Sequence, residues 1–128
     1  MKLEICTLCE YASEHNGRLT IVDTFDAIVA LKFPWRAYFH FAAKINMSDN
    51  QKEYQKIRML IIKSDDDCEV LFDTNGSYNH IDKAEKMNLL AGFKGIIFNS
   101  LGEYKFQVFF DDELVVNHPF KLILKDGK

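Results

Sequence analysis

Glycine and proline are scarce in this chain, whose 128 residues include 6 Gly and 2 Pro. Collagen-like and disordered chains are rich in these residues, so the composition argues against both classes. The hydrophobic fraction is 48%, and 11 Phe and 5 Tyr provide large side chains for a core. A chain of this length is the size of one domain, and we expect a single domain over residues 1–128.

Long apolar runs are also lacking, and none approaches the roughly 18 residues that a membrane-spanning helix needs. The first ten residues do not resemble a secretory signal, because Glu4 and Glu10 interrupt their apolar stretch. The cysteine count is three, an odd number that does not make a disulfide framework. We therefore expect a soluble protein of a reducing compartment, the cytoplasm by default.

Positive charge is not in excess, since 16 Lys and Arg stand against 19 Asp and Glu, for a formal net charge of -3. Nucleic-acid binding requires clustered Lys and Arg, and an anionic membrane surface attracts polybasic runs. Here the basic residues are interspersed with acidic ones throughout the chain. We expect neither nucleic acid nor a membrane as a partner.

Strict alternation of apolar and polar residues marks the end of the chain. One face of the first stretch carries Tyr104, Phe106, Val108 and Phe110. After a turn at Asp111-Asp112, the alternation resumes with Phe120, Leu122 and Leu124. A period of two predicts strands that bury one face and expose the other to water.

The clearest strand is predicted over Trp35–Met47. One of its faces carries Trp35, Ala37, Phe39, Phe41, Ala43, Ile45 and Met47. The other face carries Arg36, Tyr38, His40, Ala42, Lys44 and Asn46. A slip of one residue would expose every apolar side chain on the first face, so we expect a firmly set register.

Further strands are predicted over Leu3–Tyr11, Arg18–Leu31, Glu53–Lys63 and Glu69–Asp73, the third of them central because it is apolar on both faces. Asn16-Gly17 predicts a tight turn between the first two. Near residues 82–90, Asp82 and Glu85 fit a capping box, and we expect one short helical turn before an extended Gly95–Phe98.

These short segments and their turns predict an all-β fold, an antiparallel two-sheet sandwich of immunoglobulin-like type with about seven or eight strands. Tyr104, at the start of the penultimate strand, stands where such sandwiches place a tyrosine that braces a corner. The cysteine pair and tryptophan spacing of antibody domains are missing.

Residues with chemical potential are present, but they form no motif. Cys6 and Cys9 would point to opposite faces of a strand, too far apart for a disulfide. Four histidines, His15, His40, His80 and His118, show no ligand spacing, and the acidic runs 65–67 and 111–113 lack the pattern of a calcium loop. We expect a protein that is not an enzyme, with no catalytic residue, no cofactor and no metal.

A candidate partner surface consists of Tyr38, His40, Phe109 and Ile123. Tyr38 and His40 share the polar face of the clearest strand, where they are either a binding surface or simply solvated. Phe109 and Ile123 are apolar residues on the otherwise polar faces of the last two strands. If those strands pair, we expect the two side chains to lie near each other as a contact patch.

Short motifs at both ends of the chain resemble a known family. They are Cys9-Glu-Tyr11, Asn16-Gly-Arg-Leu19, Ile21-Val22 with Phe25-Asp26, and Gly102-Glu-Tyr104, Val108, Asp111-Asp112, Val115 and Pro119-Phe120. The family is an uncharacterised group of small single-domain bacterial β-sandwich proteins, a domain of unknown function. Where it usually has Asp-Gly in the hairpin, this chain has Asp111-Asp112. The resemblance implies a bacterial source and a sandwich fold, and it transfers no catalytic residue.

Two functions follow as hypotheses. The first is a non-enzymatic module that binds another protein, or a second copy of itself, through a sheet face or edge. The alternative is a small-ligand binding domain with a pocket between the sheets or at their end, lined by aromatic side chains.

Overall fold

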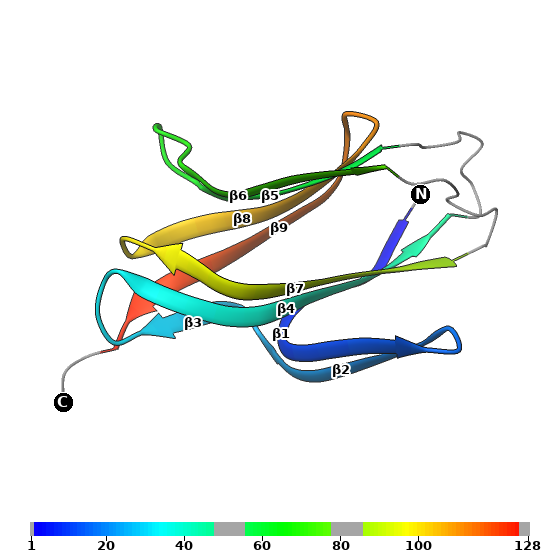
Figure 1. Ribbon diagram of the computed structural model, residues 1–128, viewed down its shortest axis with the longest axis horizontal. Coiled ribbons are helices and arrows are strands. Elements are labelled where there is room, and N and C mark those ends of the chain that lie inside the picture. Colours follow the sequence, from blue (N-terminus) through cyan, green and yellow to red (C-terminus); the bar gives the residue numbers. More distant parts are fainter. Residues whose placement is uncertain (1, 48–55, 78–85, 126–128) are drawn as a thin grey trace.

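The fold is built from strands alone. A computed structural model describes residues 2–47, 56–77 and 86–125, and within these ranges every regular element is a β-strand (Figure 1). The strands are β1 (Lys2–His15), β2 (Arg18–Phe25), β3 (Ala27–Ala30), β4 (Trp35–Asn46), β5 (Lys56–Lys63), β6 (Val70–Ser77), β7 (Lys86–Phe98), β8 (Gly102–Phe110) and β9 (Glu113–Leu124).

The strands form two stacked sheets, so the predicted two-sheet sandwich is confirmed. Sheet A has the order β2-β1-β4-β7, and sheet B has the order β3-β9-β8-β5-β6. The strand predicted to be central, β5, lies between β8 and β6. The order β9-β8-β5-β6 matches the G, F, C and C′ strands of immunoglobulin sandwiches, and β4 beside β7 matches B beside E.

Aromatic side chains fill the space between the sheets. Phe39 and Phe41 of β4 are 3% and 0% exposed, and Phe106 of β8 is 0% exposed. The rings of Phe41 and Phe106 approach to 4.1 Å between centroids, which joins the two sheets at the centre. Burying a side chain of this size contributes about 1.5–3 kcal/mol, so the alternation read from β4 and β8 defines the main core.

Two features of the predicted topology were wrong. The segment Arg18–Leu31, expected as one strand, is two strands in different sheets, and this raises the number of strands in the described part of the chain to nine. The second of them, β3, pairs in parallel with β9, from Ala27 beside Lys121 to Ala30 beside Leu124. The sandwich is therefore not purely antiparallel. The chain bends at Asp26, whose carbonyl accepts the N–H of Lys121 at 3.0 Å and fixes the crossing.

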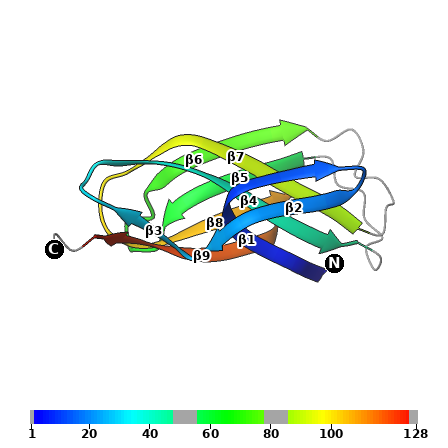
Figure 2. The same cartoon turned by 90° about the horizontal axis from the view of Figure 1, so that it is seen from below.

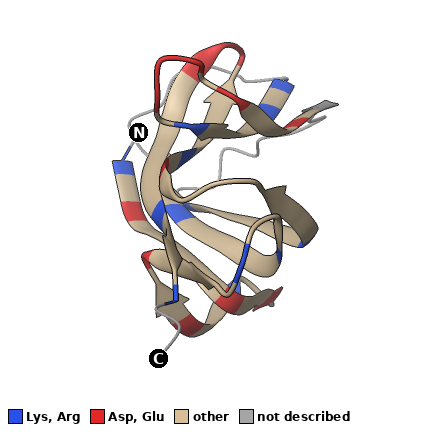
Figure 3. Ribbon diagram, turned by 90° about the vertical axis from the view of Figure 1, so that its left-hand side faces the viewer, with Lys and Arg blue, Asp and Glu red and all other residues tan. Residues whose placement is uncertain are grey.

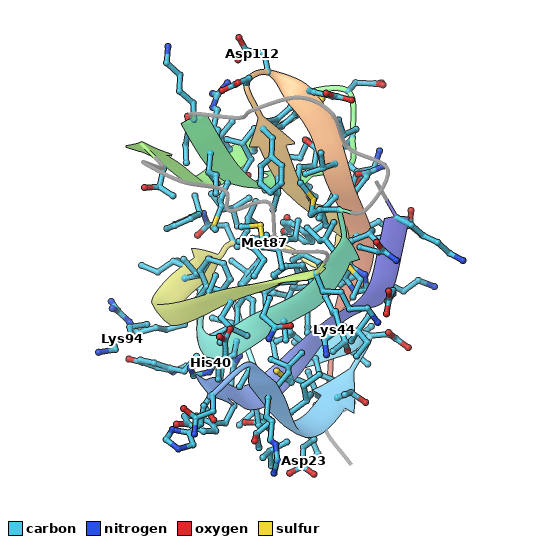
Figure 4. All side chains as sticks on the ribbon, turned by 90° about the vertical axis from the view of Figure 1, so that its right-hand side faces the viewer. Asp23, His40, Lys44, Met87, Lys94 and Asp112 are labelled. Carbon is cyan, nitrogen blue, oxygen red and sulfur yellow. The ribbon has the colours of Figure 1, made fainter. Side chains whose placement is uncertain are left out.

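The helical turn expected near residues 82–90 is wrong over its second half. Residues 86–90 belong to β7 and pair with Ala42–Asn46 of β4, while residues 82–85 lie outside the described ranges. Met87 and Leu89 stand opposite Ile45 and Ala43 on the inner face. Figure 4 shows Met87 pointing into the space between the sheets. Pairing with β4 along its whole length outweighs the weak helical spacing of this segment.

Tyr104 braces the corner between β7 and β8. Its side chain is 1% exposed, and its hydroxyl donates a hydrogen bond to the carbonyl of Ser100 at 2.7 Å. Its ring packs against Phe98 and Phe120, at 5.0 and 5.8 Å between centroids. The bond to a carbonyl just upstream is the feature that defines the tyrosine corner of immunoglobulin-like sandwiches.

We predict that Tyr104→Phe lowers the free energy of unfolding by about 1–3 kcal/mol, because it removes the hydrogen bond from the buried Tyr104 hydroxyl to the carbonyl of Ser100. Urea denaturation measures the change. The matched control is Tyr38→Phe, which removes a hydroxyl from a side chain that is 64% exposed and changes stability by less than about 0.5 kcal/mol. Equal effects of the two substitutions would contradict the role of the corner.

Candidate functional site

Strand β1 separates from β4 at its middle. Its first half pairs with β4, from Lys2 beside Asn46 to Cys9 beside His40. In the same register Glu10 would stand opposite Phe39, on the face that packs into the core. Burying an unpaired carboxylate there is costly, because the interior offers it neither water nor a counter-charge. The alternation that places Leu8 inside therefore ends at Glu10, and the strand turns away.

The second half of β1 and β2 form a hairpin that folds back over the outer face of β4 and β7. Figure 1 shows this hairpin beneath β4 as a third layer, and Figure 2 shows it crossing β4 and β7. The predicted turn at its tip is confirmed, with φ of 52° at Asn16 and 76° at Gly17. The tip is attached to β7, since Asn88 Nδ2 donates to the carbonyl of Gly17 at 3.3 Å.

A second, smaller core holds the hairpin in place. Cys9, Ala12 and Ala42 are 0%, 7% and 0% exposed, and the partly buried side chains around them are Leu19, Ile21 and Leu90. Small residues dominate this cluster, so the hairpin can approach the sheet closely. Ala42, expected on a solvated face, is thus an interior residue.

His40 fastens the hairpin at the bend of β1. Its Nδ1–H donates to the carbonyl of Glu10 at 3.1 Å, and its ring meets Tyr11 edge-on at 5.2 Å. The ring also lies across Gly92 of β7, where a Cβ would approach Nε2 to 3.1 Å. In Figure 4, His40 lies where sheet A meets the hairpin, and Asp23 lies at the hairpin's far edge.

The departure of β1 leaves one edge of β4 open. Residues 35–39 pair with β7 on one side, from Trp35 beside Phe98 to Phe39 beside Phe93. On the other side, the pairing with β1 ends at His40, and no other described strand takes its place. A cleft of about 410 Å³ lies along this edge, lined by Glu10, Phe25, Ala27, Ile28, Val29, Trp35, Arg36, Ala37, Tyr38 and Phe39.

The cleft combines an apolar floor with a polar rim. Ala37, Phe39 and Ile28 are 5%, 3% and 9% exposed and belong to the main core. Tyr38, at 64% exposed, and Glu10 stand at the rim. In a β-strand, alternate N–H and C=O groups point to each side, so residues 35–39 present such groups away from β7, towards the open edge. This arrangement suits the binding of an extended chain.

The predicted partner surface is not one surface. Tyr38 lines the cleft, whereas His40 lies partly buried beneath the hairpin. The expectation that Phe109 and Ile123 lie together is wrong. Phe109 pairs with Leu114 next to the β8–β9 turn, and Ile123 pairs with Val29 at the opposite end of β9. Sequence reasoning missed the cleft, because it arises where one strand leaves another.

A contact between Cys6 and His118 was also missed, since the two are 112 residues apart in the chain; Cys6 Sγ lies 3.6 Å from His118 Nδ1. Burial raises the pKa of the Cys6 thiol to about 11. Burial also lowers the pKa of His118, against the attraction of Asp26. Both groups are therefore neutral near pH 7, whereas cysteine nucleophiles need a thiolate. The pair is a packing contact inside the sandwich.

The remaining candidates serve turns. Asp65 Oδ1 accepts the N–H of Asp67 and of Cys68, at 3.1 and 3.0 Å, and Asp111 Oδ1 accepts the N–H of Lys56 at 2.8 Å. Asp111 and Asp112 both have positive φ, so the turn without glycine is kept. In the described part of the chain, His, Cys, Asp and Glu form no group of three that could hold a metal. His80 lies outside the described residues.

Comparisons with known proteins identify the family. A model of a family of unknown function, DUF6941, matches residues 4–123. The chain belongs to this family. Among solved structures, it is similar to a crystal structure of an immunoglobulin-like protein from Pseudomonas aeruginosa, with 12% identity, 90% of each chain covered and a TM-score of 0.47. No curated protein matches the chain. No helix among the described residues is long and apolar enough to cross a membrane.

We predict that one thiol of the native protein reacts quickly with a disulfide reagent at pH 8. Cys68 is exposed, whereas Cys9 is buried and Cys6 is half-buried with a raised pKa. Spectroscopic counting of released thiolate measures the reaction. Cys68→Ser should abolish the fast phase, and unfolding in urea should release the other two thiols. A fast phase that persists in Cys68→Ser would show that Cys6 or Cys9 is reactive.

We predict that stability falls as the pH drops below about 6.5, partly through His118. Burial lowers its pKa in the folded state. The unfolded chain therefore binds more protons in this window, and acid favours unfolding. The free energy of unfolding between pH 7.5 and 5 should fall less in His118→Gln than in the parent protein. His15→Gln, at an exposed position near the hairpin tip, is the control. Parallel pH profiles for all three proteins would contradict the assignment.

Proposed function

We propose that this protein is a non-enzymatic binding module that takes up an extended segment of a partner protein as an added strand on β4. The observation that supports it is the open edge at residues 35–39, which lies in a cleft over an apolar floor. Strand addition uses such an edge for main-chain hydrogen bonds and the adjoining pockets for side-chain recognition. The cleft supplies both.

The edges of β7, β2 and β3 carry features that discourage pairing. On β7, Lys94 is exposed and points into solvent (Figure 4), and Gly95, at a φ of 84°, bulges the strand. On β2, Asp23 has a φ of 53°, and β3 has 4 residues. Lysines, bulges and short strands are the means by which proteins protect sheet edges from association. The edge of β4 at residues 35–39 lies along the cleft instead.

The distribution of surface charge does not favour a different kind of partner, such as a polyanion. Figure 3 shows Asp and Glu both at the upper turns and near the lower end of the view, and Lys and Arg dispersed along the strands. At the edge of sheet B, Arg58 and Asp73 form an ion pair at 2.9 Å across β5 and β6, both side chains well exposed. Mixed charge of this kind favours solubility over binding of a polyanion.

A small apolar molecule is the second candidate ligand, because the cleft volume of about 410 Å³ falls within the range of small-molecule sites. Phe25, Trp35 and Tyr38 would supply aromatic walls for it. Such a ligand would use the floor of the cleft and would leave the main-chain groups of β4 unused.

We also propose the bacterial cytoplasm as the setting. All three cysteines are free thiols, which suits a reducing compartment. The bacterial source remains what the family resemblance implies.

The proposed function is tested by selecting random seven-residue peptides from a display library on the immobilised protein. We predict that the selected peptides bind the Ala27→Trp variant at least about tenfold more weakly than they bind the parent protein. Ala27 lines the cleft from β3, so the added ring occupies the space that a peptide needs. Isothermal titration calorimetry measures the affinities, and thermal unfolding verifies that the variant folds.

The matched control is Thr74→Trp, which places the same ring at an exposed position of β6, the edge strand of sheet B. It should bind the peptides as the parent protein does. Selection that yields no binding peptide, or peptides that bind Ala27→Trp unchanged, would contradict the proposed function.

A further inference from the structure

The register of sheet A shows what the open edge of β4 can accept. If β1 continued along β4, Glu10, Ala12 and Glu14 would stand opposite Phe39, Ala37 and Trp35. Those three β4 side chains pack into or against the main core. The chain's own continuation would thus place two carboxylates over an apolar floor. A segment that extends the existing β1–β4 ladder must carry apolar residues at these positions.

The middle position has the most room. Ala37 is the small residue between Trp35 and Phe39, and Phe25 and Ile28 line the cleft beside it. Large and small side chains alternate across well-packed facing positions. The residue opposite Ala37 can therefore be large and apolar, and it would lie over the surface that Phe25 and Phe39 form, whose rings meet edge-on at 6.4 Å between centroids.

Charge sets the direction and the flanking residue. Glu10 stands at the end of the cleft nearest to Phe39, and Glu14 and Asp23, both exposed, lie on the same hairpin. At the other end, Arg36 reaches away over β7, where its guanidinium would lie 3.1 Å from a Cβ on Gly95. A segment antiparallel to β4, as β1 is, has its N-terminal end beside Glu10. A basic residue fits there.

We propose that the partner segment is a strand with a basic residue followed by apolar residues at alternate positions, antiparallel to β4 and centred opposite Ala37. This inference rests on the strand-binding function proposed above. Its outward residues stand beside Tyr38 and Arg36 and are polar, because that face is open to water. The recognised class is therefore an amphipathic extended peptide rather than a helix or a fully apolar tail.

Three capped synthetic peptides test the pattern by calorimetry against the parent protein. The first is Lys-Val-Thr-Leu-Thr-Val-Lys. The second has the same composition with the alternation lost, Lys-Val-Val-Leu-Thr-Thr-Lys. The third, Lys-Glu-Thr-Leu-Thr-Glu-Lys, has glutamates at the second and sixth positions, which face the cleft floor where Glu10 and Glu14 would lie if β1 continued. We expect the first to bind, the second to bind at least about tenfold more weakly, and the third not to bind measurably.

Two versions of the first peptide test the strand geometry. One is N-methylated at the Val and Leu positions and the other at the Thr positions. Only one set of N–H groups faces β4, so one version should lose binding and the other should retain it. Equal binding by both versions would exclude strand addition, and with it both this inference and the proposed function.

A charge exchange tests the direction. Replacing the first Lys of the first peptide by Glu should weaken binding about threefold, and Glu10→Lys should reverse that preference. Glu103→Lys, an exposed position at the start of β8, is the control and should leave the preference unchanged. A preference that Glu10→Lys does not alter would overturn the assigned direction.

The outcomes distinguish failure of the inferred peptide pattern from failure of the proposed strand-binding function. The inferred pattern is wrong and the proposed function stands if all three synthetic peptides bind alike. The same conclusion follows if library-selected peptides bind while Lys-Val-Thr-Leu-Thr-Val-Lys does not. If neither the library nor the designed peptides yield binding, both are wrong.

Discussion

A carboxylate that cannot enter the interior shapes one side of this molecule. Glu10 follows Leu8 in the alternation of β1 and would face the core beside Phe39 if the strand ran on. An unpaired charge in such surroundings costs more than strand pairing returns. The strand therefore separates from β4, and the hairpin, the crossing to β3 and the exposed edge of β4 all follow from that departure.

The hairpin turns this departure into a stable arrangement. Its own apolar residues are few, and an isolated hairpin is marginal in water. Small side chains at Cys9, Ala12 and Ala42 allow it to lie close to sheet A, and His40 joins it to the bend. The outer face of sheet A is thus partly an interior, and the cleft is bounded by an element that is fixed at both its tip and its bend.

The sequence predicted correctly the strands that bury one face and expose the other. In β4 and β8, one face meets the other sheet, so the alternation in Trp35–Met47 and Tyr104–Phe110 gave the core correctly. In β7, Leu89 meets the main core and Leu90 meets the hairpin. Because β7 has apolar residues on both faces, its sequence does not alternate with a period of two. The three-residue spacing of Met87 and Leu90 then resembles that of a helix. The tyrosine corner was predictable because its signal is local.

The cleft and the Cys6–His118 contact could not be predicted in the same way. Both depend on which strands are neighbours, and short-range patterns do not contain that information. Phe109 and Ile123 illustrate the limit, since their strands pair as expected but the register puts them at opposite ends. In retrospect, Glu10 carried a readable signal, because it is a charge at an inward position of an otherwise well-patterned strand.

The parallel pairing of β3 with β9 bears on how the protein is made. Ala27 lies beside Lys121, 94 residues later in the chain, so sheet B cannot close around β3 until β9 has been synthesised. Until then the aromatic inner faces of both sheets lack their full cover. Contacts so distant in the chain form slowly and leave nascent chains prone to aggregation. Completion of sheet B therefore depends on the synthesis of β9.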